Sequence, residues 1–272
     1  MKAARILSRG ARIAARTDGE AGKPWLVLLN SLGADWTMWD DQIPLLTQTH
    51  RVLRIDARGH GQSDGPAGPY DFPMLVADVV AVMDHFGVER ADLMGLSLGG
   101  MTALGLVLAH PERVGRMIVC DARADNPPPF VASWDDRIAA INRGGMAAIK
   151  DGTLDRWFTP DCPAAIRDRA AEMILATSTA GYIGCAEALK SLNYIDDLGR
   201  IAVPVLYVVG ENDMGAPAAA MQDMAERTPV SEFAVIAGMA HVPNMEAPDA
   251  FNAAITPWLR EAAAIALSGA EA

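Results

Sequence analysis

Short apolar runs recur along the chain, and stretches with helical periodicity separate them. The runs cover residues 25–29, 52–55, 91–96, 116–120, 204–209 and 232–236. Strands that are buried on both faces have continuous apolar sequences of this kind, and their alternation with helices is typical of a parallel sheet. The pattern predicts an α/β fold in which a mostly parallel, twisted sheet is flanked by helices.

The stretch between the second and third runs has the spacing of a crossover helix. Apolar side chains recur at helical intervals, at Leu75, Val79, Val82, Met83 and Phe86. Asp71 is a suitable N-cap for this helix, and Gly87 is a suitable stop. Nearer the N-terminus, the residues around Ser8-Arg9-Gly10 alternate as in a β-hairpin. Their basic character resembles a transit peptide, but the alternation favours the hairpin.

Residues 121–200 lack the strand pattern and open with a proline cluster, Asn126-Pro127-Pro128-Pro129. Helical stretches follow at 134–141 and 164–175. We therefore expect an all-helical cap that is inserted after the strand ending at Cys120. The predicted domains are a core, residues 1–120 and 201–272, and a cap, residues 121–200.

A loop and one more helix follow the last apolar run. Phe251, Ile255 and Leu259 fall on one face of this helix. Pro257 lies inside it and is expected to kink it, because proline cannot donate the backbone hydrogen bond that a helix interior needs.

Composition and charge exclude several classes of protein. With 51% apolar and 21% charged residues among 272, the chain is of the globular type. Its net charge of -11 argues against a nucleic-acid partner, since phosphate binding needs a clustered basic surface. The longest stretch without charge, residues 93–109, contains four glycines and suits a buried strand, turn and helix better than a membrane span.

The cysteines indicate neither a disulfide framework nor a metal site. Cys120, Cys162 and Cys185 are odd in number and have no metal-ligand spacing. No signal peptide is visible. The sequence predicts a cytoplasmic protein that uses no metal or other cofactor, and it leaves association into a homo-oligomer open.

The segment Gly95-Leu96-Ser97-Leu98-Gly99 matches G-x-S-x-G, the motif of a nucleophile elbow. A glycine-rich turn with an incidental serine could also produce the match. The context favours the elbow, because the motif follows an apolar strand and opens a helix, and its glycines suit a strained turn. Ser97 is the predicted nucleophile.

A serine hydroxyl needs a base, and the base needs a group that orients it. His241 follows the last strand in a loop at the expected edge of the sheet, whereas capping, surface or structural roles suit the other histidines, His50, His60, His85 and His110. Asp213 follows the strand at 204–209 and gives the chain order Ser, Asp, His. Asp121 and Glu211 remain rivals for the acid.

A tetrahedral oxyanion needs two backbone N–H donors. Leu98 supplies one, because it follows the nucleophile. The loop after the first parallel strand, Asn30-Ser31-Leu32-Gly33, supplies the other, and Leu32 is the expected donor.

With these residues the chain resembles the 3-oxoadipate enol-lactonases of the α/β-hydrolase fold. The likeness rests on residues 30–33 with Trp39 and Gln42, on 51–64 (RVLRIDARGHGQSD), on 95–100 (GLSLGG), on 156–159, and on the segments around Asp213 and His241. It implies hydrolysis of a small ester or lactone, namely a five-membered enol-lactone that bears a carboxylate, without a metal and under a helical cap.

The substrate pocket is expected where the cap begins. Family members tend to carry Asn-Thr-Ala-Ala after the strand that follows the elbow, and this chain has Asp121-Ala122-Arg123-Ala124. Arg123 is the candidate to hold a substrate carboxylate, because a guanidinium can grip it with two hydrogen bonds. An ion pair of Arg123 with Asp121 or Asp125 is the alternative. Asp121 and Trp134 are further candidates for the pocket wall.

Two other functions stay open at this level. A carbon-carbon bond hydrolase of a vinylogous diketone uses the same fold and triad. A non-catalytic, ligand-sensing relative could retain the scaffold. Dehalogenases and epoxide hydrolases of this fold need a carboxylate nucleophile, and serine at position 97 excludes them.

Overall fold

The computed structural model describes residues 2–269, with side chains up to residue 260. The described residues form one eight-stranded sheet with the strand order β1-β2-β4-β3-β5-β6-β7-β8. The strands are β1 (Lys2–Ser8), β2 (Ala11–Asp18), β3 (Trp25–Leu29), β4 (Arg51–Ile55), β5 (Ala91–Leu96), β6 (Val114–Cys120), β7 (Val205–Gly210) and β8 (Ser231–Ile236). Strands β3 to β8 are parallel, and β1 and β2 pair in antiparallel fashion at one edge. The predicted α/β class, the apolar runs and the N-terminal hairpin are confirmed.

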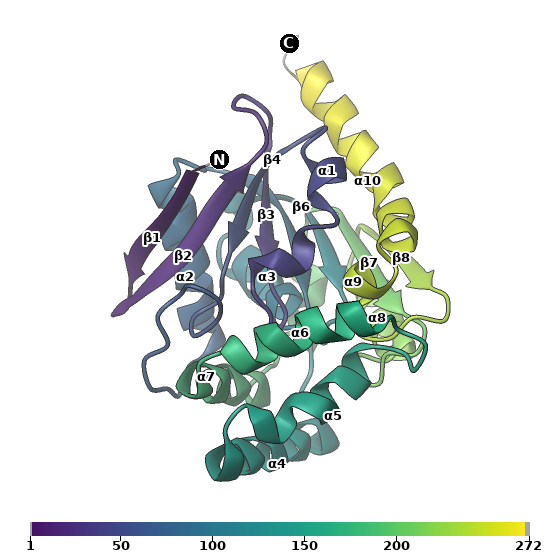
Figure 1. Ribbon diagram of the computed structural model, residues 1–272. Coiled ribbons are helices and arrows are strands. Elements are labelled where there is room, and N and C mark those ends of the chain that lie inside the picture. The colour runs from purple at the N-terminus through teal and green to yellow at the C-terminus, as the bar shows by residue number, and fades with distance from the viewer. Residues whose placement is uncertain (1, 270–272) are drawn as a thin grey trace.

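Helices cover both faces of the sheet (Figure 1). They are α1 (Ile43–Leu46), α2 (Phe72–His85), α3 (Leu98–Ala109), α4 (Pro128–Gly144), α5 (Ala147–Trp157), α6 (Ala164–Ala176), α7 (Thr179–Lys190), α8 (Ala218–Arg227), α9 (Pro243–Glu246) and α10 (Pro248–Gly269). Because crossovers between parallel strands are almost always right-handed, this strand order is expected to put α1 and α10 on one face of the sheet and α2, α3 and α8 on the other. Because the strand order reverses direction after β4, a crevice is expected where the carboxyl ends of β3 and β5 meet.

Local sequence signals position α2 and α10 as expected. The Asp71 side chain accepts a hydrogen bond from the Met74 N–H at 2.7 Å, and Gly87 follows the helix with a φ of 68°. Phe251 and Ile255 of α10 are fully buried, and Pro257 lies inside the helix. The kink at Pro257 stays a prediction.

Four helices, α4 to α7, connect β6 to β7, where the sequence predicted a helical insertion. They lie beyond the carboxyl ends of the parallel strands, at the bottom of Figure 1. Gly59 and Gly181 bring the core loop after β4 against α7, since a Cβ on Gly59 would lie 2.3 Å from the Cα of Gly181. The division of the chain into a core and a separate cap domain made of α4 to α7 stays a prediction.

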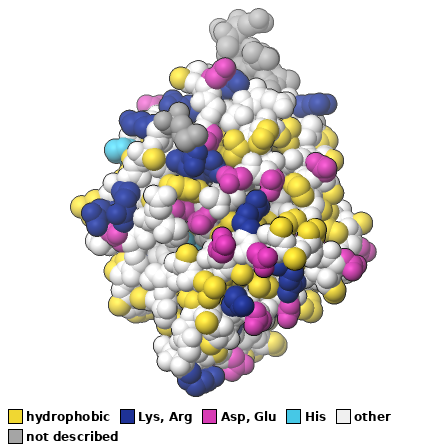
Figure 2. Space-filling view, viewed as in Figure 1, with side chains coloured by type: hydrophobic (Ala, Val, Ile, Leu, Met, Phe, Trp, Pro, Cys, Tyr) yellow, Lys and Arg dark blue, Asp and Glu magenta, His cyan; other side chains and the backbone are white. Residues whose placement is uncertain are grey.

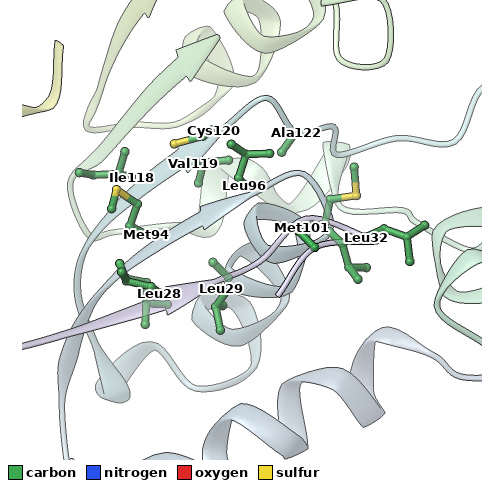
Figure 3. Packing of buried hydrophobic residues seen from close by; sticks show 14 of the residues in the cluster. Leu28, Leu29, Leu32, Met94, Leu96, Met101, Ile118, Val119, Cys120 and Ala122 are labelled. Carbon is green, nitrogen blue, oxygen red and sulfur yellow. The ribbon is translucent and has the colours of Figure 1, made fainter. Parts of the chain in front are cut away.

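The centre of the sheet is apolar on both sides. Side chains of β3, β5 and β6 lie in neighbouring rows in Figure 3, with Leu28, Leu29, Met94, Leu96, Ile118, Val119 and Cys120 labelled. Leu32 and Met101 lie beside one another past the strand ends. This packing makes the central strands a rigid support for the loops at their carboxyl ends.

The surface is of mixed charge. Acidic side chains lie among basic ones across the face in Figure 2. Within the part of the chain that the structure describes, none of the helices is both long and apolar enough to cross a membrane.

Candidate active site

Ser97 occupies the sharp turn between β5 and α3. Its backbone has a φ of 54° and a ψ of -117°, a conformation that is strained for a residue with a side chain. A Cβ on Gly95 would lie 2.4 Å from the carbonyl carbon of Gly99, and a Cβ on Gly99 would lie 2.2 Å from the carbonyl oxygen of Leu29. The glycines are therefore required by close backbone contacts on both sides of the serine.

His241 and Asp213 form a hydrogen-bonded pair. The Nδ1 of His241, in the loop between β8 and α9, lies 2.7 Å from the Oδ2 of Asp213, in the loop after β7. The N–H of Gly215 donates to the other carboxylate oxygen of Asp213 at 2.7 Å. Burial by itself raises the pKa of this carboxyl, but the charge of His241 and the donated hydrogen bonds outweigh it, so that the pKa lies below its ordinary value. Asp213 is thus an ionised acceptor that fixes one tautomer of His241.

One cavity of about 540 Å³ is lined by all of the predicted site residues except Leu98. Its walls include Leu32, Ser97, Asp121, Arg123, Trp134, Asp213 and His241. A larger hollow of about 750 Å³ lies at the amino ends of the strands, between Trp25 and Trp258, and none of the predicted residues lines it. The smaller cavity is the candidate site, because the serine, the histidine and the carboxyl groups converge there.

The predicted oxyanion donors, Leu98 and Leu32, lie at the start of α3 and in the loop after β3. Leu98 is the first residue of α3, and the first N–H groups of a helix have no acceptor inside it. Leu32 is buried in the loop after β3 and lines the cavity. Their role as the two oxyanion donors stays a prediction.

Asp121 lies beside the Asp213–His241 pair, with a carboxylate oxygen within 4.8 Å of a donor atom of each. Its Oδ1 accepts a hydrogen bond from the N–H of Gly210 at 2.8 Å, and its side chain is fully buried. Glu211, the other rival, bonds through Oε2 to the N–H of Gly238 at 2.7 Å. Of the three carboxyl groups, Asp213 is the one within hydrogen-bond distance of His241.

Three arginines line the cavity. Arg123 pairs with Asp125 at 2.7 Å, lies over the ring of Phe130, and has a buried Nε without a hydrogen-bond partner among the described residues. Sequence reasoning missed Arg137 on α4 and Arg156 on α5. Burial, and then the charge of Arg137, lower the pKa of Arg156 to about 10.

Aromatic and apolar side chains complete the wall. The buried Trp134 is stacked under the guanidinium of Arg137, whose central carbon lies 4.4 Å from the ring centroid. Tyr182 and Trp157 were not predicted, and Met214 is exposed at the rim. Trp134 and Arg137 are three positions apart, and residues at this spacing lie on the same face of a helix. This spacing is the signal in the sequence that could have identified Arg137 as a neighbour of Trp134.

The other histidines lie elsewhere. His60 is fully buried, and its Nδ1 lies 3.0 Å from the carbonyl oxygen of Arg58, which is a structural position. The expectation of a capping or surface role is wrong for His50. His50 is buried, with its ring nitrogens near the Thr49 hydroxyl and an Asp92 carboxylate oxygen, because it leads into β4, an interior strand of the sheet.

The donor atoms of Asp121, Asp213 and His241 lie within 4.8 Å of one another, which is a spacing that could hold a cation. The Nδ1 of His241 is already engaged by Asp213, so a metal would have to replace this hydrogen bond. The arrangement suits proton transfer through the free Nε2 of the ring.

Comparison with known proteins identifies the fold and the family of the chain. Residues 24–154 match the family model described as the alpha/beta hydrolase fold. The chain is 34% identical to 3-oxoadipate enol-lactonase 2 of Acinetobacter baylyi, over 88% of this chain and 90% of that protein.

Solved structures are similar over nearly the whole length. The enol-lactonase from Burkholderia xenovorans LB400 is 32% identical with a TM-score of 0.90, and the match covers 95% of this chain and all of that one (100%). A hydrolase from Pseudomonas aeruginosa is 36% identical with a TM-score of 0.86, over 93% of this chain and 96% of that one.

Proposed function

The chain belongs to the 3-oxoadipate enol-lactonase family of the α/β-hydrolase fold, and on that premise we propose that it cleaves a small carboxylic ester or lactone through an acyl-enzyme formed on Ser97. The observation that carries the proposal is the hydrogen bond between His241 and Asp213 in the wall of the cavity that Ser97 also lines. A nucleophile, a base and an orienting acid in one cavity are the parts that acyl transfer requires.

The proposed first half of the reaction makes the acyl-enzyme. Asp213 accepts the Nδ1 hydrogen of His241, which leaves Nε2 as an acceptor for the Ser97 proton. The Ser97 oxygen attacks the carbonyl carbon, and the N–H groups of Leu98 and Leu32 stabilise the oxyanion. His241 then returns the proton to the leaving oxygen. In a lactone this opens the ring and leaves the enol oxygen attached to the acyl chain.

The second half releases the product. A water molecule gives its proton to His241 and attacks the acyl carbon, and the oxyanion forms in the same place. Collapse of this intermediate restores Ser97 and frees a carboxylic acid. A buried, ionised Asp213 stabilises the imidazolium of His241 in both halves.

The cavity favours a small anionic substrate. A volume of about 540 Å³ lies in the range of small-molecule sites. The guanidinium groups of Arg123, Arg137 and Arg156 supply positive charge inside a protein whose net charge is -11. A five-membered enol-lactone that bears a carboxylate is the substrate class that we propose, in line with the relatives named enol-lactonases.

The test replaces the nucleophile. Ser97→Ala is expected to lower kcat by about 10⁶ on phenyl acetate and on a carboxylated enol-lactone, because the residues of a triad act as a unit. The matched control is Ser191→Ala at the end of α7, where the hydroxyl donates to the carbonyl of Ala188 and lies outside the cavity lining. Activity of Ser97→Ala near that of the control contradicts the proposal.

A vinylogous diketone belongs in the same assay. If the wild-type chain cleaves it with a higher kcat/KM than the ester and the lactone, the reaction is carbon-carbon bond hydrolysis with the same residues. Absence of turnover on all three substrates is the result expected of a ligand-sensing relative.

A further inference from the structure

Asp121 is a second buried carboxyl group beside the proposed acid. It directly follows β6, with a φ of 44° that is unusual for a residue other than glycine. An oxygen of Asp121, an oxygen of Asp213 and a ring nitrogen of His241 lie within 4.8 Å of one another. Both carboxyl groups are shielded from water, with exposed fractions of 0% for Asp121 and 4% for Asp213.

Two ionised carboxylates at this separation in a buried site repel each other strongly, and one of them keeps a proton. Asp213 is the one held as an anion, because His241, Gly215 and Ala216 all donate to it. Among the described residues, one group donates to the Asp121 side chain, namely the N–H of Gly210, which bonds to Oδ1. Its Oδ2 is buried and has no partner among the described residues.

The other groups around Asp121 do not compensate a second negative charge. Cys120, its neighbour on β6, is a fully buried thiol that supplies no positive charge, and burial is the main cause that raises its pKa. Arg123 turns its guanidinium to Asp125. Burial first, and then the charge of Asp213, raise the pKa of Asp121 well above its ordinary value. If Asp121 were ionised, its Oδ2 and the Asp213 carboxylate would both be hydrogen-bond acceptors and would repel each other. A protonated Oδ2 of Asp121 is a donor and can bond to Asp213.

We propose that Asp121 is a positioning residue that stays protonated at neutral pH and donates a hydrogen bond from Oδ2 to the Asp213 carboxylate. This role rests on the proposed function, because it acts through Asp213 on His241. The bond links β6 to the loop after β7, while Oδ1 of the same carboxyl group holds the end of β7 at Gly210. One neutral acid thereby fixes the orientation of Asp213 and moderates its basicity toward the imidazole.

Infrared difference spectroscopy tests the proton without reference to activity. The spectrum of wild type minus Asp121→Asn, recorded at pH 8, is expected to contain the carbonyl stretch of a protonated carboxylic acid, with a shift in heavy water. At this pH Asp56, whose pKa is raised by burial to about 7, is mostly ionised and is also common to both proteins. The matched control is Asp223→Asn, an exposed carboxylate paired with Arg227, which should give no such band.

The pH dependence of kcat/KM supplies the second readout. Asn at position 121 can still donate to Asp213 and accept from the N–H of Gly210, so the acid limb of the profile should stay where it is in the wild type. Asp213→Asn, by contrast, should lower kcat by about 10⁴ through a wrongly held histidine. Asp121→Ala removes the donor, leaves Asp213 a stronger acceptor, and should move the acid limb to higher pH.

The proposal is overturned if the carbonyl band is absent, or if Asp121→Asn moves the acid limb to lower pH by more than about half a unit, as loss of a real negative charge near His241 would do. It is also overturned if a chelator lowers wild-type activity and the band is missing, because a cation then lies between the carboxylates. The band is independent of turnover, so its presence stands even if Ser97→Ala remains active and the proposed function fails. If Asp121→Ala does not fold, the infrared band and the pH profile of Asp121→Asn still test the proposal.

Discussion

At the scale of single residues, charge inside the cavity is the feature that chemistry can test most directly. Arg123 was expected to hold a substrate carboxylate or to pair with a neighbouring acid. It does pair with Asp125, and it also lines the cavity with an unpartnered, buried Nε. A carboxylate that reached this guanidinium would compete with an aspartate that is itself partly exposed.

We expect Arg123→Met to lower kcat/KM for a carboxylated lactone by tenfold or more, where each factor of ten corresponds to about 1.4 kcal/mol. The kcat/KM for a matched lactone without the carboxylate should change much less. Kinetics on the two lactones measure the difference. Arg200→Met is the control, since Arg200 is exposed and pairs with Asp197 away from the cavity. Equal losses on both lactones would show that Arg123 is not the anchor, and the same assay on Arg156→Met would then examine the second cation.

At the scale of elements, the turn from β5 into α3 is determined by backbone proximity. The serine has a positive φ, and a methyl group cannot be accommodated on either side of it, because Gly95 lies against the backbone of Gly99 and Gly99 lies against Leu29 of β3. The N–H of Ser97 bonds to the carbonyl of Cys120, which ties the turn to β6 at 2.9 Å. The strain at Ser97 is therefore held by the surrounding sheet rather than by the turn itself.

Gly99→Ala is expected to lower the free energy of unfolding by about 1–3 kcal/mol and to reduce kcat, because its Cβ would lie 2.2 Å from the Leu29 carbonyl oxygen and must displace β3 or α3. Urea denaturation and esterase assays measure the two effects. Gly152→Ala in α5 is the control. Its nearest neighbour would be 3.8 Å away, so the free energy of unfolding should stay the same or rise by up to about 1 kcal/mol. Unchanged stability of Gly99→Ala would contradict the close approach.

At the scale of the whole molecule, two buried groups in the loop after β4 give stability opposite dependences on pH. Burial raises the pKa of Asp56 from 3.8 to about 7, and burial lowers the pKa of His60 from 6.5 to about 4. The contribution of Asp56 is present below pH 3.8 and is lost as the pH rises through 7. The contribution of His60 is present above pH 6.5 and is lost as the pH falls through 4. In the wild type the two slopes largely offset each other between these limits.

Single variants should separate the slopes. The quantity to compare is the free energy of unfolding of each variant minus that of the wild type. This difference should rise for Asp56→Asn as the pH increases from 4 to above 7, and it should fall for His60→Gln as the pH increases from 4 to 6.5. Each change should be on the order of 3 kcal/mol. Urea denaturation at a series of pH values measures both differences. Asp151→Asn, at an exposed carboxylate, is the control variant. Differences that are flat for Asp56→Asn and His60→Gln would mean that the two groups titrate normally in the fold.

The sequence by itself determined the strands, the elbow and the members of the proposed triad. Continuous apolar runs identify buried parallel strands because both faces of such a strand are covered. The setting of Ser97 between a strand and a helix is local, so a motif of five residues was sufficient to find it. Asp213 and His241 could be predicted from the sequence, because the carboxyl ends of parallel strands meet at one edge of the sheet.

Only the tertiary structure decided how the two aspartates differ and which cap residues enter the cavity. Asp121 and Asp213 both follow strands at the same edge, and the positions of the loops after β7 and β8 place His241 against Asp213 and leave Asp121 behind it. Arg137 and Arg156 lie on helices whose apolar patterns do not specify which polar side chain turns inward. Their place in the wall follows from the packing of α4 and α5 over the sheet edge, a long-range arrangement that no local pattern encodes.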